Sequence, residues 1–342
     1  MAHALVVLSW RGRWEQALRA AVSDPFERET GIRVEHLPHV GLALPEPLAS
    51  ALNSGGIPPV HIAWSNSVPA LQAVDAGHCV PLVPDRMAML RQLRRRAHPE
   101  GCSGFPIVHP YVVHYVLGYR RDAFLGDPPK SWNILRDKRH KGKIALYPGG
   151  NGFYPIAQHM AGGGIHGIPQ EMEPCWSYMR QLRDAVGLLD YSIGMEQQFK
   201  ERSLDLCFRA LPNMLAFAEA GAAVSWTVPE EGTTDTLDAL WIPRGVPESM
   251  VACAMRYIDF ALRPDVQQDW CSRLGVLPVH SDAATPALLK NCAQLPDTAD
   301  DLRGILYVPE RVKALHQPSW EQQFRNILVH QTGNIYGAIA SN

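Results

Sequence analysis

The chain has 342 residues, of which 46% are hydrophobic and 19% are charged, and its formal net charge is -2. This composition is that of a globular protein and excludes disorder, and the balanced charge provides no basic field for nucleic acid or an acidic membrane surface. The length predicts two domains or lobes.

No apolar stretch approaches the roughly 20 residues that a membrane-spanning helix needs, so we expect a soluble protein. The first three residues, MAH, run straight into a predicted strand at 4–8 and do not have the pattern of a secretory leader. Two possibilities follow: the protein is cytosolic, or its numbering begins after a leader has been removed.

Strands alternate with helices in the first part of the chain. Continuous or alternating apolar residues predict strands at 4–8, 32–37 and 60–64, and helical spacing predicts helices at 13–22, 24–30 and 45–52. Asp24 is the expected N-cap of the second helix and Gly31 its C-cap. This β-α-β-α-β order predicts a parallel sheet whose carboxyl-end loops are open to a ligand.

A second α/β set follows, joined to the first by an extended segment at 105–119 and a returning strand at 237–242. Its strands are predicted at 144–147, 204–208 and 223–228, and its helices at 153–161, 175–184 and 212–220. The remainder predicts helices: one capped by Ser249 and running through Leu262, one from Pro264 to Gly275, and a last one that opens with a capping box at 319–322.

Three predicted strand ends carry small, hydroxyl or amide residues where a helix is about to begin, at 9–12, 64–66 and 149–152. Backbone N–H groups at such positions favour anionic or polar ligands. An arginine there offers a planar fork of donors to a carboxylate or phosphonate. Arg11 and Arg209 are therefore candidate counter-charges, and Trp10 and Trp64 are candidate walls of a binding site.

Familiar catalytic and metal-binding patterns are missing from the sequence. The segment at 162–167 matches G-x-G-x-x-G by letters only, because it follows a helix and opens none. The seven cysteines form no C-x-x-C pair, so no metal or cofactor is indicated. Cys207 beside Arg209 is the one candidate for a catalytic thiol, although its apolar strand pattern favours a buried structural thiol.

Several stretches, in this order, resemble one known family. They are LSWRGRW at 8–14, PFERETGIRV at 25–34, HIAWSNSVPALQAVDAG at 61–77, LGYRRDAF at 117–124, PKSWNILRDKRHKGKIAL at 129–146 and VPEEGTTDTLDALWIPRGVP at 228–247. The chain resembles the extracytoplasmic solute-binding proteins of ABC transporters, in the type II group that includes polyamine- and ferric-ion-binding members.

The resemblance implies an α/β, two-lobed periplasmic-binding-protein-like fold of type II, with two hinge crossovers and C-terminal helices. The expected boundaries are 1–110 and 246–342 for lobe 1, 118–238 for lobe 2, and 111–117 and 239–245 for the crossovers. It also implies a monomer in the periplasm, with its signal peptide removed, that captures a small molecule in the interlobe cleft and delivers it to ABC permease subunits. No enzyme activity, cofactor or nucleic acid is implied.

The pattern departs from the family at the positions that would select the ligand. Polyamine binders that resemble this chain carry an acid after the first-strand tryptophan, where Gly12 stands here, and acids in the loop that corresponds to the acid-free 149–152. Polyamine binders also have an aromatic residue two positions before the aspartate of the returning strand, whereas this chain has Thr236 two positions before Asp238. Ferric-ion binders use adjacent tyrosines, which are missing here. We therefore expect a small organic anion or zwitterion with a carboxylate or phosphonate group.

The predicted ligand-binding residues are Trp10, Arg11, Trp64, Ser65, Asn66, Asn151, Gly152, Phe153, Arg209 and Asp238. The arginines would supply charge, the serine and asparagines hydrogen bonds, and the aromatic residues apolar walls. Three alternatives stay open: a polyamine-type binder, a transferase on a bilobal fold with Cys207 as nucleophile, and a cytosolic sensor or scaffold that reuses the binding fold.

Overall fold

The computed structural model describes residues 4–125, 127–189 and 195–328. The chain forms two compact units: unit 1 comprises Met1–Val113 and Thr236–Asp301, and unit 2 comprises His114–Asp235 and Leu302–Asn342. Two of the three unit boundaries fall inside strands, β5 (Tyr111–Arg120) and β10 (Asp235–Pro243). In the described residues, no helix is long and apolar enough to cross a membrane.

Unit 1 is built on a sheet whose neighbouring strands follow the order β2-β1-β3-β10. The pairs β1–β2 and β1–β3 are parallel, and β10 returns antiparallel to β3, with Asp238 opposite Asn66. The short strand β4 pairs with β10, and β11 pairs with β5. The strands that belong wholly to this unit are β1 (Leu5–Trp10), β2 (Val34–His39), β3 (Ile62–Asn66), β4 (Cys79–Val80) and β11 (Leu277–Pro278).

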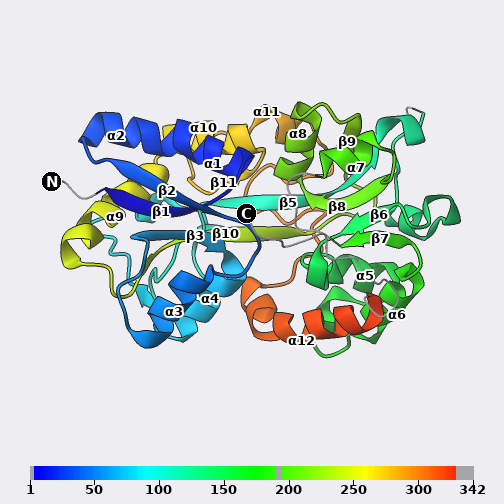
Figure 1. Cartoon of the computed structure of the whole chain (residues 1–342), viewed down its shortest axis with the longest axis horizontal. Helices are drawn as coiled ribbons and strands as arrows, with labels where there is room; N and C mark the ends of the chain where they lie inside the picture. Colours follow the sequence, from blue (N-terminus) through cyan, green and yellow to red (C-terminus); the bar gives the residue numbers. More distant parts are fainter. Residues whose placement is uncertain (1–3, 126, 190–194, 329–342) are drawn as a thin grey trace. The chain divides into compact units, whose positions relative to one another are not determined.

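Helices lie on both sides of the unit 1 sheet, with α1, α2 and α10 above it and α3 and α4 below it in Figure 1. Their bounds are α1 (Arg13–Leu18), α2 (Asp24–Thr30), α3 (Glu46–Ser54), α4 (Ser67–Asp75), α9 (Glu248–Ala261), α10 (Pro264–Leu274) and α11 (Ala287–Lys290). This arrangement confirms the predicted alternation and explains why β1 and β3 are almost wholly buried: both of their faces are covered.

Two predicted helix starts in unit 1 are wrong. Asp24 does not cap a new helix, because a π-helical turn at Arg19–Ser23 joins α1 to α2 and gives Asp24 helical dihedral angles. Ser249 lies inside α9, which begins at Glu248 after Pro247. The predicted C-cap is confirmed: Gly31 has a φ of 71°, in the left-handed region that a glycine adopts without strain.

Unit 2 has a mixed sheet in which β5 pairs antiparallel with both β8 and β9, and β6 pairs parallel with β8 and β7. Its own strands are β6 (Ile144–Leu146), β7 (Val186–Leu189), β8 (Leu206–Ala210) and β9 (Val224–Thr227). Its helices are α5 (Tyr154–Met160), α6 (Glu173–Leu182), α7 (Glu196–Lys200), α8 (Leu211–Glu219) and α12 (Glu310–Leu328).

The long helix α12 belongs to unit 2, whereas residues 246–342 were expected in lobe 1. In Figure 1, α12 lies beside α5 and α6. It begins at Glu310, so the expected capping box at 319–322 is wrong and Pro318 stands within the helix. The helix packs closely on a glycine turn: a Cβ atom on Gly150 would come within 2.6 Å of the buried Phe324 ring.

Candidate functional site

Two aromatic rings meet at the carboxyl ends of the first two strands of unit 1. The ring of Trp10, the last residue of β1, lies 4.3 Å from that of His39, the last residue of β2. The exposed Arg11 follows, and its backbone N–H donates to the carbonyl of His39. Burial lowers the pKa of His39 to about 4, so its imidazole is neutral at pH 7. Sequence reasoning missed His39, because a residue at the end of a half-buried strand has no local signal of its own.

Trp64 occupies the core of unit 1. Its side chain is fully buried, and its ring packs against Trp14, Tyr111 and Trp270 at centroid distances of 6.1, 6.2 and 5.4 Å. The predicted strand ended at Trp64, but β3 continues to Asn66, which puts the tryptophan inside the strand. This environment is that of a core residue, and we do not retain Trp64 as a wall of the site.

Ser65 and Asn66 are buried and hydrogen-bonded within unit 1. The Ser65 hydroxyl accepts a bond from Trp241 Nε1 at 3.0 Å. The Asn66 side chain accepts from the backbone N–H of Val68, which caps α4, and donates to Thr236 Oγ1 at 3.3 Å. These bonds hold the end of β3 to β10 and to the start of α4, so both residues have a structural task whether or not they also meet a ligand.

Asp238 is also buried in unit 1. Its carboxylate accepts a hydrogen bond from the Tyr111 hydroxyl at 2.8 Å. Burial raises the pKa of Tyr111 well above its usual value, and the neighbouring Asp238 adds to the shift, so the phenol stays protonated as the donor. The main-chain carbonyl of Asp238 also bonds to His109 Nδ1 at 2.8 Å.

Arg209 is the central feature of the candidate site in unit 2. It lies at the carboxyl end of β8, its side chain is fully buried, and its guanidinium lies over the ring of Tyr147, 4.3 Å from the centroid. Its Nη1 donates to the carbonyl of Phe208 at 2.8 Å. The Tyr147 hydroxyl in turn accepts from the backbone N–H of Ala210 and donates to Asn213. The two hydrogen bonds of its hydroxyl hold the Tyr147 ring in place, and the ring in turn holds the Arg209 guanidinium in one position.

A second tyrosine connects Asn151 to the same cluster. Asn151 Nδ2 donates to the hydroxyl of Tyr115 at 2.7 Å. The ring of Tyr115 lies 5.9 Å from that of Tyr147 and stacks on Phe208 at 4.7 Å. The structure thus places Asn151 and Arg209 around one group of aromatic rings. Tyr115 and Tyr147 were not predicted as site residues, although Tyr115 lies in the extended segment expected at 105–119 and Tyr147 ends the strand expected at 144–147.

Gly152 and Phe153, at the end of the loop 149–152, are closely packed within unit 2. The backbone of Gly152 has a φ of 76°, and a Cβ atom there would come within 2.5 Å of the Tyr115 ring, so only glycine fits. Its carbonyl accepts a bond from Thr234 Oγ1 at 2.7 Å. Phe153 is fully buried against Trp132 and Phe208 and is a core residue in this structure.

Cys207 lacks the surroundings of a nucleophile. It is fully buried, burial raises the pKa of its thiol to about 12, and its Sγ lies 3.5 Å from the sulfur of Met214. A catalytic thiol needs a lowered pKa and access to substrate. None of the seven cysteines, which all lie in the described residues, forms a disulfide, and the described part of the chain has no group of three or more His, Cys, Asp or Glu side chains arranged to hold a metal ion.

The structure thus has two α/β units with polar and aromatic residues at strand ends, and comparison with known families gives the class of protein. The sequence model of the family described as bacterial extracellular solute-binding protein matches residues 21–297. The chain belongs to this family, which confirms the predicted resemblance and makes it an extracytoplasmic solute-binding component of an ABC transporter. Members of this class bind and deliver small molecules and are not enzymes.

Solved structures confirm the predicted fold class. An ABC transporter substrate-binding protein from Bradyrhizobium japonicum USDA 110 has a TM-score of 0.80 at 17% identity, with 95% of this chain and 99% of that chain covered. The PBP AgtB from A. tumefaciens R10, in complex with agropinic acid, has a TM-score of 0.78 at 18% identity over 96% and 100%. PotD of the spermidine/putrescine transporter from Streptococcus pneumoniae has 0.69 at 16% over 95% and 99%. No curated protein matches the chain in sequence.

Proposed function

We propose that this solute-binding protein captures a small organic anion or zwitterion, bearing a carboxylate or phosphonate, and delivers it to its ABC permease. The observation that carries the proposal is Arg209, a fully buried guanidinium at a strand end that lies over the Tyr147 ring. Arginine forms paired hydrogen bonds with planar oxyanions, and a fixed arginine loses little entropy on binding one.

The neighbouring groups suit the same kind of ligand. Asn151 supplies an amide, Tyr115 and Tyr147 supply hydroxyls, and the loop 149–152 carries no acid. A polyamine brings several ammonium groups, and an ammonium buried beside Arg209 without a carboxylate would cost several kcal/mol. The solved structures described as holding agropinic acid and as a GABA receptor support an anion or zwitterion, whereas PotD represents the polyamine alternative.

In unit 1, Trp10, His39 and Arg11 form the second set of proposed ligand contacts. The neutral imidazole and the indole offer flat apolar surfaces with one polar edge each, and the exposed arginine adds a positive charge. We propose a monomer in the periplasm with these contacts, and we assign no catalytic role to Cys207.

Native mass spectrometry of protein purified from its source would identify a retained ligand. Isothermal titration with a panel of carboxylates, phosphonates and polyamines would then rank the classes. We expect binding of one acidic compound, weakened by Arg209→Lys and unaffected by the exposed control Arg28→Lys. Nanomolar binding of spermidine by the wild-type protein would overturn the proposal.

A further inference from the structure

Unit 2 contains a pocket that shares no lining residue with the Arg209 cluster. It has a volume of about 730 Å³ and is formed by residues between 120 and 140, together with Asp205, which directly precedes β8. Its lining combines apolar side chains, among them Phe124 and Leu125, with the ionisable side chains of Arg120, Lys130, Arg139 and His140. The function proposed above gives this pocket no role.

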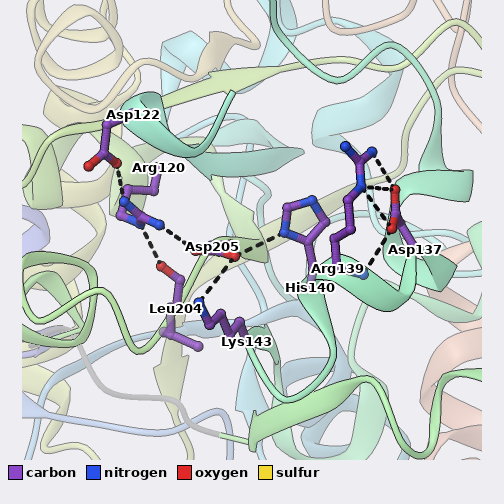
Figure 2. A network of polar contacts seen from close by, with 8 residues as sticks. All are labelled: Arg120, Asp122, Asp137, Arg139, His140, Lys143, Leu204 and Asp205. Carbon is purple, nitrogen blue, oxygen red and sulfur yellow. Dashed lines mark hydrogen bonds and ion pairs between the residues drawn. The ribbon is translucent and has the colours of Figure 1, made fainter. Parts of the chain in front are cut away.

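Asp205, which lines the pocket, is the centre of a network of charged side chains, shown in Figure 2. The buried carboxylate of Asp205 accepts from Arg120 Nη2 at 2.7 Å and bonds to His140 Nδ1 at 3.0 Å, and Lys143 Nζ lies 3.9 Å away. Burial disfavours the charged carboxylate, but the bonds from His140 and Arg120 outweigh it and lower the pKa of Asp205. Its negative charge is therefore compensated by positive groups.

The rim of the pocket is exposed and basic. The side chains of Lys130 and Arg139 are 69% and 79% exposed. Each has an acidic neighbour, Asp127 at 4.0 Å and Asp137 at 2.6 Å. The segment 120–143 around the pocket holds eight Lys or Arg against three Asp. The pocket lining itself has three basic side chains, Arg120, Lys130 and Arg139, against the two carboxylates of Asp127 and Asp205. Such a local excess attracts anions over the distance of a Debye length.

One wall of the pocket is apolar and partly open to solvent. The Phe124 ring stacks on His140 with a centroid distance of 5.1 Å. Leu125 is 93% exposed and has a φ of 47°, in the left-handed region that a leucine rarely adopts. Phe124 and Leu125 together form an apolar wall next to the basic side chains of Lys130 and Arg139.

We propose that this pocket binds an amphiphilic organic anion. The oxyanion would face Lys130 and Arg139, and the apolar part would lie against Phe124 and Leu125. Alkyl phosphates in solution and the headgroups of anionic phospholipids share this chemistry. The inference goes beyond the proposed function and does not depend on the ligand that Arg209 meets.

The test is calorimetric titration with hexyl phosphate, with hexanol and inorganic phosphate as separate probes of the two halves of the ligand. Lys130→Glu/Arg139→Glu should weaken hexyl phosphate binding about tenfold or more. The control Arg28→Glu/Lys290→Glu makes the same change of charge on the exposed surface of unit 1 and should leave the affinity unchanged. Leu125→Asn should weaken hexyl phosphate but not inorganic phosphate, since asparagine tolerates the left-handed conformation.

Two further measurements decide the site and the source. Arg209→Gln, or Asn151→Leu if the first variant does not fold, should bind hexyl phosphate as well as the wild type does. Equal weakening by the two double variants, or loss of binding in the Arg209 or Asn151 variant, would overturn the pocket assignment while leaving the proposed function standing. Sedimentation with phosphatidylglycerol vesicles, with the same two double variants, tells whether the anion is taken from a bilayer or from solution.

Discussion

Tyr111 donates its phenolic hydrogen to the carboxylate of Asp238 over 2.8 Å, and both side chains are almost wholly buried. Replacing Tyr111 by Phe removes this donor and keeps the ring. Because a buried carboxylate that loses a donor keeps the cost of its desolvation, we expect the free energy of unfolding to fall by about 1–3 kcal/mol. Urea unfolding followed by tryptophan fluorescence measures it. No change in stability would mean that the bond contributes nothing.

The Arg209→Lys variant tests the geometry of the proposed anion contact. Lysine keeps the positive charge but has neither the planar fork nor the flat face that lies over Tyr147. We expect the affinity for the identified ligand to fall about 10- to 100-fold, that is by about 1.4–2.8 kcal/mol. Calorimetry at constant ionic strength measures this. An affinity equal to that of the wild type would show that charge alone, or no contact at all, is involved.

The Gly150→Ala variant separates a packing role of the glycine loop from a ligand-binding one. The glycine has a φ of 70°, and an added Cβ would come within 2.6 Å of Phe324 on α12. We expect a loss of about 1–3 kcal/mol in the stability of unit 2. Thermal unfolding measures it, and Gly162→Ala is the matched control: its φ is 79°, but no atom lies within 4 Å of its added Cβ. Equal losses in the two variants would leave only backbone strain as the cause.

Three buried histidines make stability depend on pH. Burial lowers the pKa values of His36, His39 and His109 from 6.5 to about 4. The unfolded chain therefore binds more protons than the folded one below pH 6.5, so stability is lost as pH falls from about 6.5 to about 4. We expect a loss of at least about 2 kcal/mol over this range for the three together. Urea unfolding at pH 7 and pH 4.5 measures it, and a constant midpoint would contradict it.

Asp205→Asn should destabilise unit 2 more than a surface substitution of the same kind. The change removes a buried partner of Arg120 and His140, which costs about 1–3 kcal/mol because Arg120 keeps its ion pair with Asp122. Asp269→Asn, which removes a half-exposed pair with Arg273, should cost less than about 1 kcal/mol. Because the pKa of Asp205 is lowered below 3.8, its contribution persists above that pH and is lost only below it.

The strands and helices that form the layers of the fold were predicted well. They depend on the spacing of apolar residues and on glycines at helix ends, which are local features of the sequence. The buried strands and the left-handed Gly31 follow directly from the residues at those positions. The predicted start of a helix was wrong where two nearby residues could each begin it. Ser249 is a good capping residue, but Pro247 with its fixed φ takes the N-cap position, so α9 begins at Glu248, two residues earlier than a Ser249 cap would place it.

The candidate site could be predicted only in part. Arg209 and Asn151 stand at predicted strand ends, and the structure groups them around the same aromatic rings. Trp64 was misplaced because two further residues of β3 turned an expected end into an interior position. The contact between Trp10 and His39 joins two strands, and no pattern within either strand contains that information.

Because α12 packs on the Pro148–Gly150 turn, the order of synthesis on the ribosome affects how unit 2 folds. The ribosome releases the strands of unit 2 long before it has made Phe324, and the space above Gly150 stays open to water until then. Unit 2 can therefore complete its packing only after α12 has been synthesised. The apolar surface that α12 covers in the folded unit stays exposed on the nascent chain until then. Such a surface is where a chaperone would bind.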